Sequence, residues 1–209
     1  WDPRAKTALS DEEVIRKETK QKLYHLRYTI DEPGDSHIII ATVRPETIMG
    51  DTAICVHPDD ERYKNLHGKF AFVPLINRRI PIITDDYVSM DFGTGALKVT
   101  PAHDQNDYQL GQKHKLQVVD VFNDDGTMSE EAQLYIGKDR FEVRKLISQE
   151  LEEKGFLVKT DEYTSEVGYS ERTDVVVEPR LSLQWWVDMK KISGPALSAV
   201  EKEEIKFYP

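Results

Sequence analysis

Short runs of β-branched and aromatic residues recur along most of this chain, and each run is closed by turn-forming residues. Residues 22–30 and 37–43 are two such runs, and the turn formers between them predict a β-hairpin with a longer loop. Further strands are predicted at 51–57, 69–75, 78–84, 95–100, 117–122, 156–160, 164–173 and 174–179. Helical segments interrupt these runs at irregular intervals. This order predicts an α+β fold with a curved or barrel-like mixed β-sheet and surrounding helices, not a doubly wound nucleotide-binding fold.

The clearest helix is predicted at 138–155, where Gly155 supplies a stop. The positions that recur at helical spacing are Val143, Leu146, Ile147, Glu150 and Leu151. Shorter helices are predicted at 58–66 and from 104 to 115, because acidic residues fill their first turns. Residues 10–20 fit no single pattern, since a capping-box sequence is not followed by an apolar stripe.

Composition limits the class of protein. The formal net charge of −10 argues, taken alone, against nucleic acid as a partner, because phosphate binding depends on lysine and arginine. The single cysteine, Cys55, excludes a disulfide framework and a multi-cysteine zinc site. No apolar run reaches the length of a membrane span, and no secretion signal precedes the first strand. We therefore expect a cytoplasmic protein with no membrane partner.

The 209 residues correspond to one domain with extensions. We expect a folded domain over residues 1–180, followed by a segment over 181–209 whose composition shifts toward helix. The chain begins without methionine and stops in a segment that reads as unfinished, so we expect it to be a piece of a longer protein.

Residues 93–108, Gly-Thr-Gly-Ala-Leu-Lys-Val-Thr-Pro-Ala-His-Asp-Gln-Asn-Asp-Tyr, combine small residues, two carboxylates and a lysine in an otherwise apolar strand. Because side chains alternate along a strand, Lys98 and Thr100 share one face. This mixture predicts the floor of a polar pocket. Gly93 and Gly95 allow either close approach to a ligand or a plain turn before the strand.

Two readings are open for His103, Asp104 and Asp107. They are candidate metal ligands by residue type, or the two aspartates cap and charge the start of a helix. A metal site needs a further ligand at defined spacing, and none is visible, so no metal is predicted. Likewise, Thr42 and Arg44 either line the pocket or belong to an exposed strand and turn. Trp185 and Trp186 either stack on bases or are buried against a neighbouring domain.

Three stretches in this order resemble the inserted editing domain of bacterial-type valyl-tRNA synthetases. They are "ATVRPETIMGDTAICVHPDDERY" (41–63), "FGTGALKVTPAHDQNDY" (92–108) and "VGYSERTDVVVEPRLSLQWWVDM" (167–189). The resemblance covers nearly the whole chain, with the isoleucyl enzymes as the alternative. The family often has Thr-Thr-Arg-Pro where this chain has Thr42-Val43-Arg44-Pro45, so position 43 lacks a hydroxyl.

The resemblance implies hydrolysis of the ester of mischarged threonyl-tRNA, with a tRNA-end-binding module that does not cleave as the alternative. It implies that Asp107 holds the α-ammonium, and that Lys98, Thr100 and Asp104 surround the threonyl side chain and ester. The other implied substrate contacts are Thr42, Arg44, Phe92, Gly93 and Gly95. The implied partners are the 3′ end of aminoacylated tRNA and a catalytic core. No cofactor is implied for this domain, since the ATP-site motifs His-Ile-Gly-His and Lys-Met-Ser-Lys-Ser are missing from the sequence.

Overall fold

The computed structural model describes residues 1–91 and 93–208, and within them a seven-stranded sheet forms the body of the protein. The strands follow the order β2-β1-β4-β5-β3-β6, and β7 pairs with β1 beside this path. Their bounds are β1 Val14–Ile30, β2 His37–Thr42, β3 Ala53–Val56, β4 Phe70–Phe72, β5 Arg79–Thr84, β6 Ala96–Val99 and β7 Leu157–Ser170.

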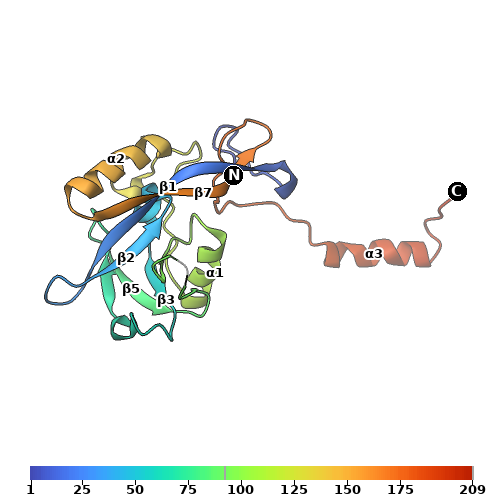
Figure 1. Cartoon of the computed structure of the whole chain (residues 1–209). Helices are drawn as coiled ribbons and strands as arrows, with labels where there is room; N and C mark the ends of the chain where they lie inside the picture. The colour runs from blue at the N-terminus through green and yellow to red at the C-terminus, as the bar shows by residue number, and fades with distance from the viewer. Residues whose placement is uncertain (92, 209) are drawn as a thin grey trace.

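The sheet is mixed and strongly curved (Figure 1). Strands β3 and β5 are parallel, and the other pairs are antiparallel. The two ends of the strand order, β2 and β6, lie against each other, so the sheet curls back on itself. The predicted α+β fold with a barrel-like mixed sheet is therefore confirmed.

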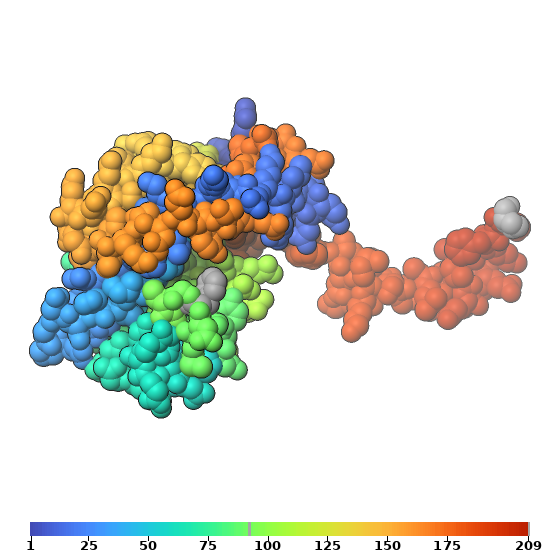
Figure 2. Space-filling model, in the orientation of Figure 1, coloured from blue at the N-terminus to red at the C-terminus, as the bar shows by residue number. Residues whose placement is uncertain are grey.

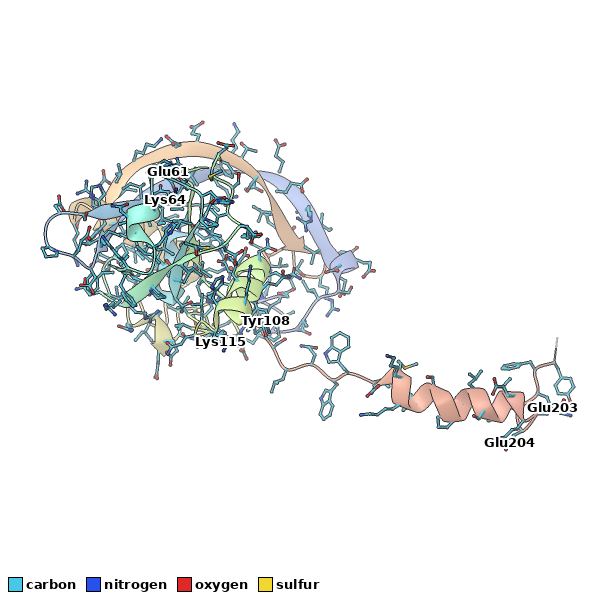
Figure 3. All side chains as sticks on the ribbon, turned by 90° about the horizontal axis from the view of Figure 1, so that it is seen from below. Glu61, Lys64, Tyr108, Lys115, Glu203 and Glu204 are labelled. Carbon is cyan, nitrogen blue, oxygen red and sulfur yellow. The ribbon has the colours of Figure 1, made fainter. Side chains whose placement is uncertain are left out.

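The hairpin predicted at 22–30 and 37–43 is present, with Tyr24 opposite Thr42. Residues 14–20, which fit no local pattern, extend β1 because the last residues of β7, from 164 to 170, pair with them (Figure 3). The runs 156–160 and 164–173 belong to this one long strand, β7. The strands predicted at 117–122 and 174–179 are wrong, since each contributes only an isolated bridge.

Three α-helices accompany the sheet in the described residues: α1 Gln105–His114, α2 Arg140–Glu153 and α3 Met189–Glu201. Helix α2 confirms the prediction for 138–155. The Asp139 side chain caps it by accepting from two backbone N–H groups. Val143, Ile147 and Leu151 are fully buried against the sheet. Short 3₁₀ segments lie at Asp11–Glu13, Pro45–Gly50, Lys64–Leu66 and Glu130–Ala132 and are called η1 to η4.

The helix predicted at 58–66 is wrong except for η3. The Asp60 carboxylate accepts from the backbone N–H and guanidinium of Arg62, which fixes a turn where the helix would start. Such local side-chain bonds compete with helical hydrogen bonding.

The main core lies between the curled sheet and α2. It is built from alternate residues of β1 and β2 together with β3 and β5, and its largest fully buried side chains include Tyr28, Leu26, Ile38, Ile40, Ile54 and Ile82. A smaller cluster joins β3 and β6 to α1 through Cys55, Val99 and Leu110. Cys55 is fully buried in this cluster and packs as a small apolar residue.

Residues 181–208 extend away from the body as an arm that contains α3 (Figures 1 and 2). Helix α3 has no buried residue. Trp185 and Trp186 are fully uncovered, with relative exposures of 102% and 88%. None of the helices in the described part of the chain combines the length and apolar character that crossing a membrane requires.

Truncation after Arg180 tests the boundary expected at this position. The shortened chain should unfold within a few degrees of the full chain, because residues 181–208 bury no side chain within this protein. A second truncation after Val177 also removes Glu178, which pairs with two arginines, and should lose about 3 kcal/mol or more. Thermal unfolding of both truncated chains measures their stability. An equal loss of stability in the two would contradict a domain boundary after residue 180.

Candidate functional site

A cluster of buried polar side chains lies where β6, η2 and α1 meet. Lys98 and Thr100 point to the same side of β6, as the alternation predicts, and are 8% and 1% exposed. The ammonium of Lys98 donates to Thr100 Oγ1 at 2.5 Å, to Thr47 Oγ1 at 3.1 Å and to Asp51 Oδ1 at 3.1 Å. The Lys98–Asp51 ion pair is therefore held on both sides by threonine hydroxyls.

Each hydrogen-bond donor of the Lys98, Thr100 and Thr47 side chains has an acceptor in or next to this cluster. The three N–H groups of Lys98 are spent on three acceptors. The Thr100 hydroxyl donates to Asp51 Oδ1 at 2.6 Å, and the Thr47 hydroxyl donates to the Arg44 carbonyl at 2.9 Å. A ligand that approaches this cluster thus meets free acceptor capacity on Thr100, and it reaches a proton of Lys98 only by displacing one of these bonds.

Asp107 is the second charged group of the site. It lies in the first turn of α1, is 7% exposed and accepts from the backbone N–H of Thr100 at 2.8 Å. Burial raises the pKa of Asp107 to about 6, although Lys98 and the Thr100 N–H oppose this change. The described residues supply no cation in direct contact with this carboxylate. Its negative charge is consequently available to a bound ammonium group.

Two glycines bring these elements close together. A Cβ on Gly50, at the end of η2, would lie 3.0 Å from Thr100 Cγ2 and from the Val119 carbonyl oxygen. A Cβ on Gly111, in α1, would lie 2.9 Å from Pro101. Helix α1 and η2 can press onto the end of β6 because both positions lack a side chain.

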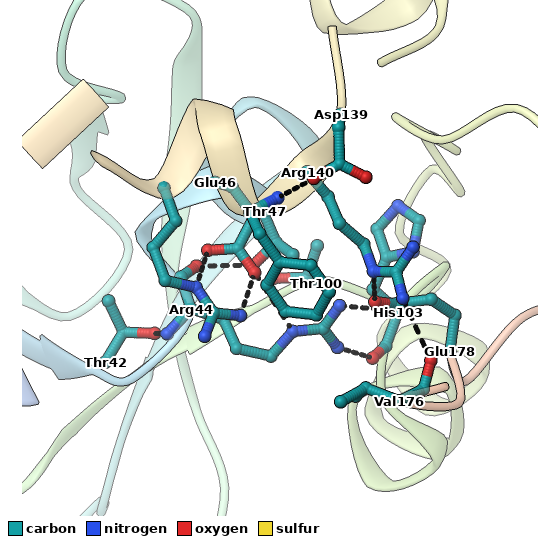
Figure 4. Close-up of polar contacts among 12 residues, drawn as sticks. Thr42, Arg44, Glu46, Thr47, Thr100, His103, Asp139, Arg140, Val176 and Glu178 are labelled. Carbon is teal, nitrogen blue, oxygen red and sulfur yellow. Dashed lines mark hydrogen bonds and ion pairs between the residues drawn. The ribbon is translucent and has the colours of Figure 1, made fainter. Parts of the chain in front are cut away.

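Arg44 belongs to a neighbouring cluster of ion pairs (Figure 4). Its guanidinium pairs with Glu178 and with Glu46 and donates to the His103 carbonyl at 3.2 Å. Arg140 also pairs with Glu178 at 2.7 Å, and Arg144 pairs with Glu46 at 2.6 Å. Arg44 thus shares two buried carboxylates with two other arginines, and a role in contacting the tRNA end stays a prediction.

The remaining candidate residues are spread around these two clusters. Thr42 ends β2, and its hydroxyl accepts from the Arg44 N–H at 3.0 Å. Asp104 is exposed and caps α1 by accepting from two backbone N–H groups, at 2.8 and 3.1 Å. Gly93 and Gly95 have φ of +60° and +73°, which favours the turn alternative. Arg62 occupies the space where a Gly95 side chain would lie. Phe92 lies outside the described residues.

The metal alternative finds no geometric support in the described part of the chain. His103 Nε2 accepts from the Val121 N–H at 3.0 Å, whereas Asp104 caps α1 and Asp107 binds the Thr100 N–H. Within residues 1–91 and 93–208, no group of three His, Cys, Asp or Glu side chains could hold a metal ion. Burial, together with Arg44, Lys98 and Arg180, lowers the pKa of His103 to about 3, so its imidazole is neutral.

A family model described as "Leucyl-tRNA synthetase, editing domain" matches residues 61–178 of the chain. This chain belongs to the synthetase editing domains. The valine–tRNA ligases of Porphyromonas gingivalis, Bacteroides fragilis and Thermotoga maritima are 57%, 59% and 52% identical to it over its whole length. The chain spans 24% of the length of each of these ligases. The resemblance to the valyl-tRNA synthetase editing domain is thereby confirmed.

The fold of this editing domain also occurs in a solved structure. A leucyl-tRNA synthetase of Agrobacterium radiobacter K84, in a ternary complex with tRNA and LeuAMS, matches 72% of the chain with a TM-score of 0.54. The chain covers 20% of that enzyme and is 22% identical to it, so this likeness shows the fold alone.

Sequence reasoning missed three residues of the site. Asp51 and Tyr28 complete the Lys98 cluster, and Glu178 holds the arginine cluster. A signal existed for Asp51, because it stands just before an apolar strand, where a buried acid needs a partner. Tyr28 and Glu178 gave no such signal, since their partners are far away in the sequence.

The raised pKa of Asp107 makes the stability of the domain depend on pH. Below pH 3.8 the carboxyl of Asp107 is protonated in both the folded and the unfolded state. As the pH rises from 3.8 to about 6, the stability of the domain falls, because the unfolded chain ionises freely while the folded domain must bury the charge. An asparagine side chain in its place cannot ionise. Relative to the wild type, Asp107→Asn should therefore gain up to roughly 3 kcal/mol between pH 4 and pH 7. Urea unfolding at both pH values measures the gain, and a difference that does not change with pH would contradict it.

Proposed function

We propose that this chain is the post-transfer editing module of a valyl-tRNA synthetase, which hydrolyses the ester of threonyl-tRNA(Val). The observation that carries the proposal is the buried carboxylate of Asp107, without a cation in contact among the described residues, beside the polar wall of Lys98 and Thr100. An anionic group next to hydroxyl acceptors suits an amino acid that bears both an ammonium and an alcohol.

The need for such a module follows from the similar volumes of threonine and valine. For valyl-tRNA synthetase itself, the known example of this limit, an apolar synthetic pocket discriminates against threonine by only about 10². A polar second site selects in the opposite sense. The threonyl hydroxyl can donate to the free lone pair of Thr100, whereas the methyl group of valine makes no hydrogen bond there.

In the proposed reaction, a water oxygen attacks the ester carbonyl, the bond to the ribose oxygen breaks, and threonine and free tRNA leave. Asp107 would hold the α-ammonium and so orient the ester. Lys98 would stabilise the developing negative charge by exchanging one of its internal hydrogen bonds for the carbonyl oxygen. Water is the only co-reactant, and no cofactor is proposed. ATP would be used only by the catalytic core of the parent enzyme.

The proposed partners are the 3′ end of aminoacylated tRNA and the synthetase core. The acidic body, with its net charge of −10, suits a module that handles only the single-stranded end while the core binds most phosphates. Trp1 and Glu178 are hydrogen-bonded, so the first residue lies beside the start of the arm. The uncovered Trp185 and Trp186 on the arm would be buried against the core.

A binding module without turnover is the second candidate function. The ion pair of Lys98 with Asp51 could position a tRNA end and still leave its ester intact. Release of free threonine over many turnovers separates the two candidates.

Deacylation assays test the proposed role of Asp107. Threonyl-tRNA(Val) should be hydrolysed faster than valyl-tRNA(Val), and Asp107→Asn should lower kcat/KM for threonyl-tRNA by roughly 10², because the ammonium loses its counter-charge. The matched control is Asp86→Asn, since Asp86 is an exposed aspartate whose partners, Lys113 at 3.7 Å and Asp85, lie outside the proposed site. Undiminished hydrolysis by Asp107→Asn removes Asp107 from the mechanism.

The net charge predicts weak binding of whole tRNA by the chain alone. We expect a Kd of about 10⁻⁴ M or weaker at physiological salt, the range of non-specific association. Fluorescence anisotropy with labelled tRNA measures it. A tight complex that weakens steeply with salt would show that this surface supplies phosphate contacts after all.

A further inference from the structure

Tyr28 is a buried tyrosine whose hydroxyl reaches the polar cluster from the opposite wall. It lies on β1, is fully buried and donates to Asp51 Oδ2 at 2.6 Å. The other oxygen of the same carboxylate, Oδ1, accepts from Lys98 at 3.1 Å and from Thr100 at 2.6 Å. Asp51 is itself 0% exposed, so bulk solvent does not compete for these bonds.

We propose that Tyr28 is a positioning residue for the hydrolysis proposed above, on which this inference rests. By holding Oδ2, it keeps Oδ1 of Asp51 turned toward Lys98 and Thr100. It thereby sets the direction of the Thr100 hydroxyl proton and leaves a Thr100 lone pair for the substrate.

The argument depends on how an aspartate rotates. The terminal torsion of a carboxylate is broad, so only its partners decide which oxygen faces which group. In Tyr28→Phe, Oδ2 would be a buried acceptor that has lost its donor, a state that costs free energy. The carboxylate can then rotate and share Lys98 and Thr100 between its two oxygens, which loosens both side chains.

The titration of Asp51 reports this change. The charged and titratable groups that face it are Lys98 from β6, Tyr28 from β1, Arg78 before β5 and Asp107 from α1. Burial raises the pKa of Asp51, and Lys98, Thr100 and Tyr28 oppose the rise. Loss of the Tyr28 hydroxyl must raise the pKa of Asp51 further, so protonation would disable the cluster at a higher pH.

The experiment compares Tyr28→Phe with a matched control, Tyr24→Phe. Tyr24 lies on the same strand, is also buried, and has Arg144, Glu46 and Ser148 as its polar neighbours instead of Asp51. Deacylation of threonyl-tRNA(Val) is measured against pH in the chain, and in a valine–tRNA ligase that carries the chain in place of its own editing domain. The carboxyl of Asp51 is followed in parallel by ¹³C NMR.

We expect Tyr28→Phe to lower kcat about tenfold with KM within about twofold, to shift the acid limb of the pH profile upward, and to move the Asp51 titration the same way. Tyr24→Phe should leave all three readouts near wild type. An unchanged Asp51 titration, or unchanged kcat with a shifted titration, overturns the inference. If the wild type hydrolyses no threonyl-tRNA, the proposed function fails, and the NMR titration still decides whether Tyr28 sets the state of Asp51.

Discussion

The ion pair between Lys98 and Asp51 is the interaction around which the site is arranged. Both charges are buried, and a buried pair is tolerated only when its remaining donors and acceptors are satisfied. Thr47, Thr100 and Tyr28 provide those partners from η2, β6 and β1. The requirement to satisfy one charge pair thus fixes three elements relative to one another, at the place where a ligand would bind.

The Glu46 and Glu178 carboxylates perform a related task beside the site. They pair with Arg44, Arg140 and Arg144, which come from the loop after β2 and from α2, so two carboxylates face three guanidinium groups. The result links the first hairpin, the long helix and the segment that follows β7. Against this rigid background Asp107 is the exception, because its charge has no cation in contact among the described residues and its pKa is raised by burial. A buried carboxylate with a raised pKa, among polar groups that are hydrogen-bonded to one another, is typical of a binding site.

Local patterns predicted the elements whose partners are close in the sequence. The hairpin of β1 and β2 and the helix α2 were predicted from turn formers, alternation and apolar spacing. The prediction failed where long-range pairing or local capping decided the outcome. Residues 14–20 are a strand because β7 lies beside them, and 58–66 is mostly a turn because Asp60 binds Arg62. The runs 117–122 and 174–179 have strand-like composition, but they make only isolated bridges instead of a ladder.

The sequence by itself determined the family and predicted the charged groups of the candidate site. Separated motifs in a fixed order identify the editing domain, and strand alternation places Lys98 and Thr100 on one face. Only the tertiary structure decided how those groups are used. It made Asp104 a helix cap, surrounded Arg44 with carboxylates and supplied Tyr28 and Asp51 to Lys98. The reason is physical: hydrogen bonds and ion pairs depend on distances between atoms, and residues 23 to 134 positions apart acquire those distances only when the sheet curls and closes.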